Sequence, residues 1–140
     1  MIIGIDFDGT CVAHDFPRVG KDIGSVPILK KLIRNGHQLI LWTMRSDMKD
    51  PKRNTPDGNL DVDDFLTHAV AWFKEHNIPL YGIQTNPGQK YWTDSPKAHC
   101  NLYIDDLALG VPLIFDINLS KHPFVDWVKV EEQLISKGLI

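Results

Sequence analysis

Acidic and hydroxyl side chains follow directly on apolar segments at three places in this sequence, and these residue types can bind a metal ion and phosphate. The stretch DFDGT at residues 6–10 follows the apolar start of the chain. Asp105 and Asp106 follow a second apolar run, and Thr43 closes a third. Because like charges at short range repel, neighbouring carboxylates need either separate solvation or a shared cation. Oxygen ligands of this kind suit a hard divalent ion such as Mg²⁺.

Five short apolar runs and three segments with helical periodicity must position these side chains. Continuous apolar runs that alternate with helices indicate a parallel sheet with both faces covered. Ligands bind to such sheets beyond the carboxyl ends of the strands, so we expect the acidic and hydroxyl residues to meet at one edge. The predicted strands lie at residues 1–6, 38–43, 80–85, 101–105 and 111–116, and the predicted helices at about 25–34, 62–76 and 123–137.

The composition is that of one ordinary globular domain. The chain has 140 residues, of which 43% are hydrophobic and 24% charged, which predicts a single domain over 1–140. The net charge of −3 argues against general affinity for nucleic acid and leaves a local basic patch open. Apolar runs far shorter than ~20 residues and the lack of a signal-peptide pattern predict no membrane partner. With only Cys11 and Cys100 able to pair, free thiols in the cytoplasm are favoured over a disulfide.

The stretch at residues 6–10 resembles the first signature of the haloacid dehalogenase superfamily, D-x-D-G-T after a buried strand. Thr43 resembles the second signature, Lys97 the third, and the pair Asp105-Asp106 the fourth. The first pattern is specific, whereas a lone Thr or Lys counts only through its position. The resemblance implies a three-layer α/β/α Rossmann-like fold with a five-stranded parallel sheet. It also implies a Mg²⁺-dependent phosphatase, a phosphoric monoester hydrolase that works through a phospho-aspartate.

The resemblance assigns a role to each acid of the first and fourth signatures. Asp6 would be the nucleophile that attacks phosphorus. Asp8 would protonate the leaving oxygen and then take a proton from the hydrolytic water. The protein ligands of Mg²⁺ would be Asp6, the backbone carbonyl of Asp8 and the side chain of Asp105, with Asp106 in support.

The second and third signatures would act on the phosphoryl group. Thr43 would hydrogen-bond this group, and Lys97 would neutralise charge on the phosphate and on Asp6. Lys90 lies in the same loop and is the alternative to Lys97.

Four further residues are candidates for substrate contact. Gly9 and Thr10 belong to the first signature, and Gly9 allows the tight turn that brings both of its carboxylates to one centre. The segment 44–60 is long and polar, contains Arg45 and Arg53, and begins directly after the second signature. Our hypothesis is that Arg45 or Arg53 contacts an anionic part of the substrate, the alternative being a solvated loop.

The spacing of the signatures leaves no room for an inserted cap domain. Asp6 and Thr43 are 37 positions apart, just enough for a loop, a helix and a strand, and the segment 86–99 is equally short. We therefore expect an open, capless site. Such a site admits large substrates or takes a lid from a second subunit, which leaves a homo-oligomer open.

Two other functions remain open at this point. The first is a receiver-like signalling domain, which carries its phosphorylated Asp after the third strand. This chain has Thr85, Asn86 and Pro87 there, and the lack of an Asp argues against this alternative. A non-hydrolytic member that binds a phosphorylated ligand is the other alternative. The phosphorylated substrate is also open, with sugar phosphates, nucleotides, phosphoproteins and nucleic-acid ends all compatible with the signatures.

Overall fold

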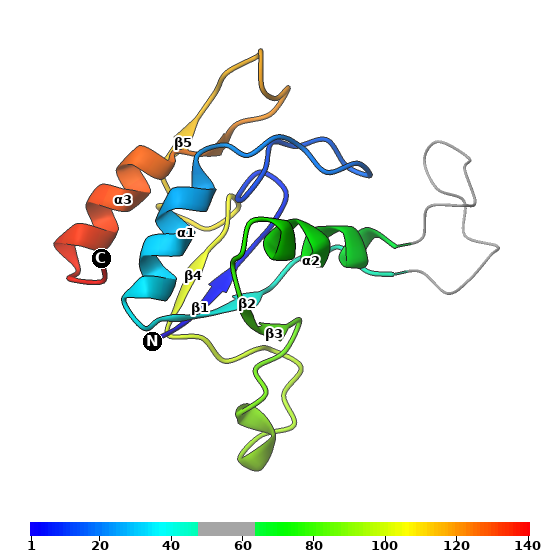
Figure 1. The fold of residues 1–140 in the computed structure, drawn as a ribbon, viewed down its shortest axis with the longest axis vertical. Coiled ribbons are helices and arrows are strands. Elements are labelled where there is room, and N and C mark those ends of the chain that lie inside the picture. Colours follow the sequence, from blue (N-terminus) through cyan, green and yellow to red (C-terminus); the bar gives the residue numbers. More distant parts are fainter. Residues whose placement is uncertain (48–63) are drawn as a thin grey trace.

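A parallel four-stranded sheet with three helices forms the body of this small α/β protein (Figure 1). The structure is a computed structural model and describes residues 1–47 and 64–140. Neighbouring strands are parallel throughout, in the order β3-β2-β1-β4. The strands are β1 (Ile2–Ile5), β2 (Gln38–Leu41), β3 (Leu80–Ile83) and β4 (Leu102–Ile104).

The helices begin where side chains satisfy the first free backbone N–H groups. At α1 (Ser25–Arg34), the carboxylate of Asp22 accepts hydrogen bonds from the N–H groups of Ser25 and Val26 at 3.1 and 3.3 Å. At α3 (Trp127–Ser136), Asp126 is the N-cap and its side chain accepts from two backbone N–H groups. The third helix is α2 (Phe65–Glu75), and the predicted beginning of this helix at 62 lies outside the described residues.

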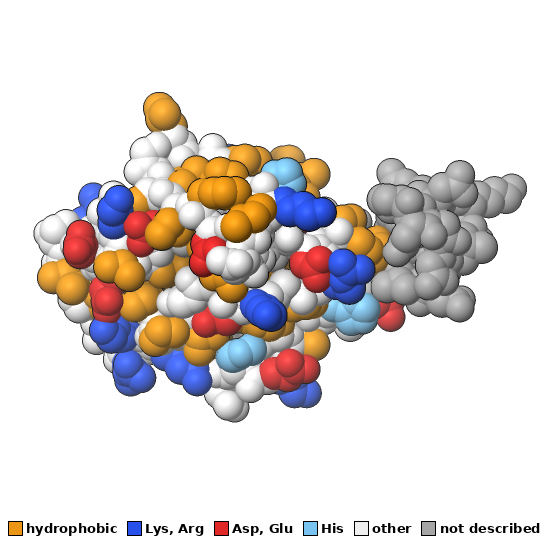
Figure 2. All heavy atoms as spheres, turned by 90° about the horizontal axis from the view of Figure 1, so that it is seen from above, with side chains coloured by type: hydrophobic (Ala, Val, Ile, Leu, Met, Phe, Trp, Pro, Cys, Tyr) orange, Lys and Arg blue, Asp and Glu red, His pale blue; other side chains and the backbone are white. Residues whose placement is uncertain are grey.

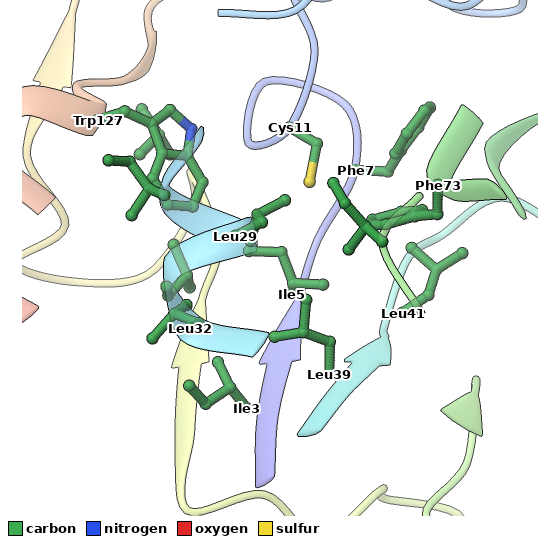
Figure 3. Close-up of a cluster of buried hydrophobic side chains, with 14 of the residues drawn as sticks. Ile3, Ile5, Phe7, Cys11, Leu29, Leu32, Leu39, Leu41, Phe73 and Trp127 are labelled. Atoms are coloured by element: carbon green, nitrogen blue, oxygen red, sulfur yellow. The ribbon is translucent and has the colours of Figure 1, made fainter. Parts of the chain in front are cut away.

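All three helices pack on the same face of the sheet and form one hydrophobic core with it (Figure 3). The register places alternate strand residues opposite one another, so that they share this face. The strands contribute Ile3, Ile5, Leu39 and Leu41 to this core, and the helices contribute Leu29, Leu32, Ala69, Phe73, Val130 and Leu134.

The connection from β3 to β4 covers the opposite face. Right-handed crossovers place α1 and α2 on one face, and the chain then moves back across the sheet to β4, which puts this last connection on the other face. A Cβ on Gly82 would lie 3.1 Å from Pro87 Cδ, and the hydroxyl of Tyr103 donates to the carbonyl of Ala98. The third layer is therefore an irregular segment with one helical turn, η1 (Gln89–Tyr91). The predicted α/β/α fold has full helices on both faces of the sheet.

The prediction of a fifth strand in the parallel sheet was wrong. In the apolar run 111–116, only β5 (Leu113–Ile114) is a strand, and it pairs antiparallel with β6 (Phe124–Val125) in a separate ribbon. The side chains of β5 are exposed. The prediction took the apolar character of residues 111–116 as a sign of burial in the sheet. The side chains of β5 are instead at the surface, so the apolar run does not mark a central strand.

Two smaller features bear on the setting of the protein. In the described residues, no helix has the length and apolar character needed to cross a membrane. Cys11 and Cys100 are both free thiols, as the sequence predicts.

Candidate active site

Three aspartates converge where β1 and β4 end. Asp6 follows β1, and Asp105 and Asp106 follow β4, whose last residue Ile104 lies opposite Ile5 in the parallel register. Each of the three aspartates offers a carboxylate oxygen, and the three oxygens lie within 4.8 Å of one another. We call these three residues the acid cluster. The parallel pairing of β1 and β4 thus brings the first and fourth signatures together.

The acid cluster is electrostatically unfavourable without a cation. Burial, aided by the charges of Asp105 and Asp106, raises the pKa of Asp6 from 3.8 to about 7, although hydrogen bonds from the Phe7 N–H and from Thr10 oppose the shift. The shift means that the carboxylate is disfavoured relative to the neutral acid at this position. A cation bound between the three side chains would reverse that preference.

Thr10 holds the acid cluster together from within. Its hydroxyl accepts a hydrogen bond from the Asp106 N–H at 3.0 Å and donates to the carboxylate of Asp6. Its carbonyl accepts from Trp127 Nε1 at 2.7 Å, and the residue is fully buried. Thr10 therefore connects β1, β4 and α3, whereas the sequence made it a candidate for substrate contact.

Gly9 is required by both the backbone conformation and the space around it. Its φ is 77°, in the left-handed region that favours glycine, and a Cβ there would lie 2.1 Å from His14 Nε2 and 2.7 Å from Asp106 Oδ2. His14 Nε2 itself lies 3.2 Å from Asp106 Oδ2. Burial raises the pKa of Asp106, aided by the charge of Asp105 and opposed by His14. No spacing signal in the sequence identifies His14 as a neighbour of the acid cluster.

Asp8 has a different environment, although it is only two residues from Asp6. Arg45 Nε donates to one carboxylate oxygen of Asp8 at 2.6 Å, and Nη2 donates to the other at 2.7 Å. The guanidinium also lies 5.1 Å from the ring centroid of Phe7 and 5.2 Å from that of Phe16. The result is a bidentate ion pair with two aromatic neighbours.

The remaining donors of Arg45 are also satisfied. Nη2 donates to the carbonyl of Arg18 at 2.7 Å, and Nη1 donates to the carbonyls of Pro17 and Phe65 at 3.2 and 3.5 Å. Arg45 is only 2% exposed. The structure therefore places this candidate substrate contact inside the protein, where it joins three segments. The other candidate, Arg53, lies outside the described residues.

Thr43 is held by a residue that sequence reasoning missed. The side-chain oxygen of Gln84 accepts from the Thr43 N–H at 3.1 Å, and its amide nitrogen donates to the carbonyls of Thr43 and Arg45. Thr43 Oγ1 accepts from the Arg45 N–H at 3.3 Å. Gln84 thus fixes the backbone that carries both Thr43 and Arg45, and a single glutamine after a strand gives no sequence signal for this role.

The ammonium groups of the two candidate lysines each lie near a tyrosine ring. Lys97 Nζ is 5.9 Å from the ring centroid of Tyr103, and Lys90 Nζ is 5.4 Å from that of Tyr91. Both lysines are exposed. Within the described residues, neither forms an ion pair with the acid cluster, so the structure does not bring the third signature to the first and fourth.

The acid cluster has the donor set of a hard divalent cation. All three ligand atoms are carboxylate oxygens, they lie within reach of one ion, and a bound cation would oppose the raised pKa of Asp6. The residues present therefore fit Mg²⁺.

Comparison with known proteins finds a second protein with a similar fold and gives no information on function. Neither protein-family models nor curated proteins match this chain. The chain is similar to the solved structure of a conserved protein from Bacteroides thetaiotaomicron, with 28% identity and a TM-score of 0.71. The similarity covers 98% of this chain and 91% of the other. The described α/β architecture thus occurs over nearly the whole length of a second protein, whose description names no activity.

Proposed function

We propose that this protein is a Mg²⁺-dependent phosphatase of the haloacid dehalogenase type, which hydrolyses phosphate monoesters through a phospho-aspartate on Asp6. The observation that carries the proposal is the acid cluster at the end of β1 and β4. The four signatures in the family's order support it. On this proposal the fold is a reduced, capless form of the Rossmann-like family fold, with four strands in its parallel sheet.

The metal would be held by this chain's oxygen atoms. Asp6 and Asp105 would bind it through their side chains and Asp8 through its backbone carbonyl, with Asp106 in support. Bound Mg²⁺ offsets the repulsion between the phosphate dianion and the carboxylates.

The first chemical step transfers the phosphoryl group to the protein. A carboxylate oxygen of Asp6 attacks phosphorus and forms a new P–O bond, while the bond from phosphorus to the ester oxygen breaks. The ester oxygen keeps the bonding electron pair and receives a proton from Asp8. Asp6 must be ionised to attack, which is why a cation in the acid cluster matters for this step.

The second step restores the free aspartate. Water attacks phosphorus and gives its proton to Asp8, and the bond between phosphorus and Asp6 breaks. The electron pair of that bond returns to the Asp6 carboxylate, and inorganic phosphate leaves. Each acid thus ends the cycle in the state in which it began.

Arg45 must be accommodated in both proton transfers. Because the guanidinium holds both oxygens of Asp8, one oxygen has to leave Arg45 to carry the proton. The three carbonyls that also bind Arg45 keep it in place meanwhile. Arg45 therefore orients Asp8 in this mechanism and does not bind the substrate.

The phosphoryl group itself would meet Thr43 and a lysine. Thr43 Oγ1 would donate to a phosphoryl oxygen, since among the described residues it accepts the Arg45 N–H and donates to no acceptor. Lys97 remains the proposed source of positive charge, with Lys90 as the alternative, and either has to move off its tyrosine ring to act.

Binding of a phosphorylated ligand without turnover is the second candidate function. The occupation of both Asp8 oxygens by Arg45 favours it, because an acid that cannot release its partner cannot shuttle a proton. A cytoplasmic location belongs to either proposal and is supported by the two free cysteines.

Hydrolysis of p-nitrophenyl phosphate by the purified chain tests the proposal. We expect Mg²⁺-dependent turnover that EDTA abolishes and that Asp6→Asn lowers at least about a thousandfold, as loss of a nucleophile does. Asp94→Asn is the matched control, because Asp94 is an exposed aspartate of the segment 86–99. Binding of phosphate esters without turnover, across a panel of sugar phosphates, nucleotides and phosphopeptides, would replace the first candidate with the second.

A further inference from the structure

A hollow of about 500 Å³ lies beside the acid cluster, between the loop after β1 and the loop that joins β5 and β6. Both loops lie at the end of the molecule drawn uppermost in Figure 1. The view onto this end in Figure 2 shows hydrophobic side chains gathered beside basic and histidine side chains. The lining includes His14, Phe16, Ile117, Leu119, Lys121 and His122.

One side chain connects the hollow to the acid cluster. His14 lines the hollow, and its Nε2 lies 3.2 Å from Asp106 Oδ2. The lack of a side chain at Gly9 is what lets the imidazole approach so closely. A ligand whose phosphate binds at the acid cluster therefore has the hollow directly beside it.

The lining offers apolar and aromatic surface. Phe16 is 50% exposed, Ile117 65% and Leu119 40%, and all three border the hollow. The rings of His14 and His122 meet edge to face, with centroids 5.5 Å apart. When a flat ring covers such side chains and displaces water, the burial of apolar surface stabilises the complex.

Two of the polar residues that line the hollow, Asp15 and Ser120, already form hydrogen bonds within the protein. Both carboxylate oxygens of Asp15 accept from Arg18, at 2.8 and 3.1 Å, and Ser120 Oγ accepts the N–H of His122 at 3.1 Å. Lys121 forms no ion pair with any described residue and adds one positive charge to the hollow.

From this lining we infer that the hollow binds the ring of an aromatic monophosphate, an aryl or nucleoside phosphate, while the phosphate lies at the acid cluster. This inference rests on the proposed function, because it takes the position of the phosphate from it. The hollow combines the apolar side chains of Phe16, Ile117 and Leu119 with polar groups, and pockets of this size with both kinds of surface are typical of small-molecule sites.

Calorimetric binding of two non-hydrolysable phosphonates to the Mg²⁺-loaded protein tests the inference. We expect phenylphosphonate to bind roughly tenfold more tightly than methylphosphonate, since the ring buries apolar surface of the hollow. Ile117→Ser should weaken phenylphosphonate roughly fourfold, the value of about one buried methylene group, and leave methylphosphonate unchanged. Val128→Ser is the matched control, because Val128 is 71% exposed and lies on α3 outside the hollow.

A third probe, a nucleoside 5′-phosphonate, distinguishes the two ring sources. Tighter binding than phenylphosphonate assigns a nucleotide, and equal or weaker binding assigns an aryl phosphate. Equal affinities for phenyl- and methylphosphonate, no effect of Ile117→Ser, or no binding of either phosphonate would each overturn the inference.

The calorimetry tests the hollow and the hydrolysis assay tests the proposed phosphatase, so a negative result in one leaves the other claim standing. A preference for the ring without turnover of p-nitrophenyl phosphate leaves the hollow in place and removes the proposed phosphatase. Turnover without any preference for the ring removes the hollow and leaves the phosphatase.

Discussion

Asp6 and Asp8 stand two residues apart and occupy opposite electrostatic environments. Asp6 faces two further carboxylates and has a pKa raised to about 7 by burial and by those charges. Asp8 has a guanidinium on both of its oxygens. The protein thus supplies its own cation to Asp8, whereas no described side chain supplies one to the acid cluster except His14, which lies beside Asp106. This difference separates the two roles that we propose for the motif, metal binding at Asp6 and proton transfer at Asp8.

Of the changes that test this difference between Asp6 and Asp8, removal of the Arg45 side chain should alter the free energy of unfolding most. Arg45→Ala leaves the partly buried carboxylate of Asp8 without its partner, and we expect the free energy of unfolding to fall by about 3 kcal/mol. Chemical denaturation measures this change. Lys31→Ala, which breaks the exposed ion pair with Glu131, should cost less than about 1 kcal/mol. Similar losses in the two variants would contradict a special role for the Arg45–Asp8 pair.

The pH dependence of Mg²⁺ binding should reflect the raised pKa of Asp6. Below about pH 7 the native state holds a proton on Asp6 that Mg²⁺ must displace, so affinity should rise about tenfold per pH unit and level off above pH 7. The same shift predicts that the metal-free protein loses stability as pH rises from about 4 to 7, because the folded state binds more protons than the unfolded state. Thermal unfolding in EDTA, compared with Asp6→Asn, isolates the contribution of this residue. An identical slope in both proteins would assign the effect to other groups.

Neutralising one acid of the acid cluster should change the free energy of unfolding least. The change should be opposite in sign to that caused by Arg45→Ala. Asp105→Asn removes one like charge while its Oδ1 can still accept the Leu107 N–H. We expect the metal-free protein to become more stable by about 1 kcal/mol or less. Added Mg²⁺ should raise the melting temperature of the wild type more than that of the variant, which binds the ion more weakly. A loss of stability in EDTA would show that the three carboxylates do not repel one another.

The sequence predicts the parallel sheet and the acid cluster because both depend on the main chain. Apolar runs locate the four strands, and parallel pairing alone then brings Asp6 to Asp105 and Asp106. The Arg45–Asp8 pair depends on where a side chain points after β2, which spacing does not determine. The position of Lys97 depends on the path of an irregular segment across the far face of the sheet. The fifth strand was predicted wrongly because exposed and buried apolar runs look alike in sequence.

Mg²⁺ titration by calorimetry on three proteins tests the central claim most directly, namely that the acid cluster and not Asp8 provides the cation-binding side chains. We expect the wild type to bind one ion per chain and Asp105→Asn to bind it at least about tenfold more weakly, because one charged ligand is lost. Asp8→Asn should keep the affinity of the wild type, since the side chain of Asp8 is engaged by Arg45. Equal weakening in both variants, or no binding by the wild type, would contradict the account.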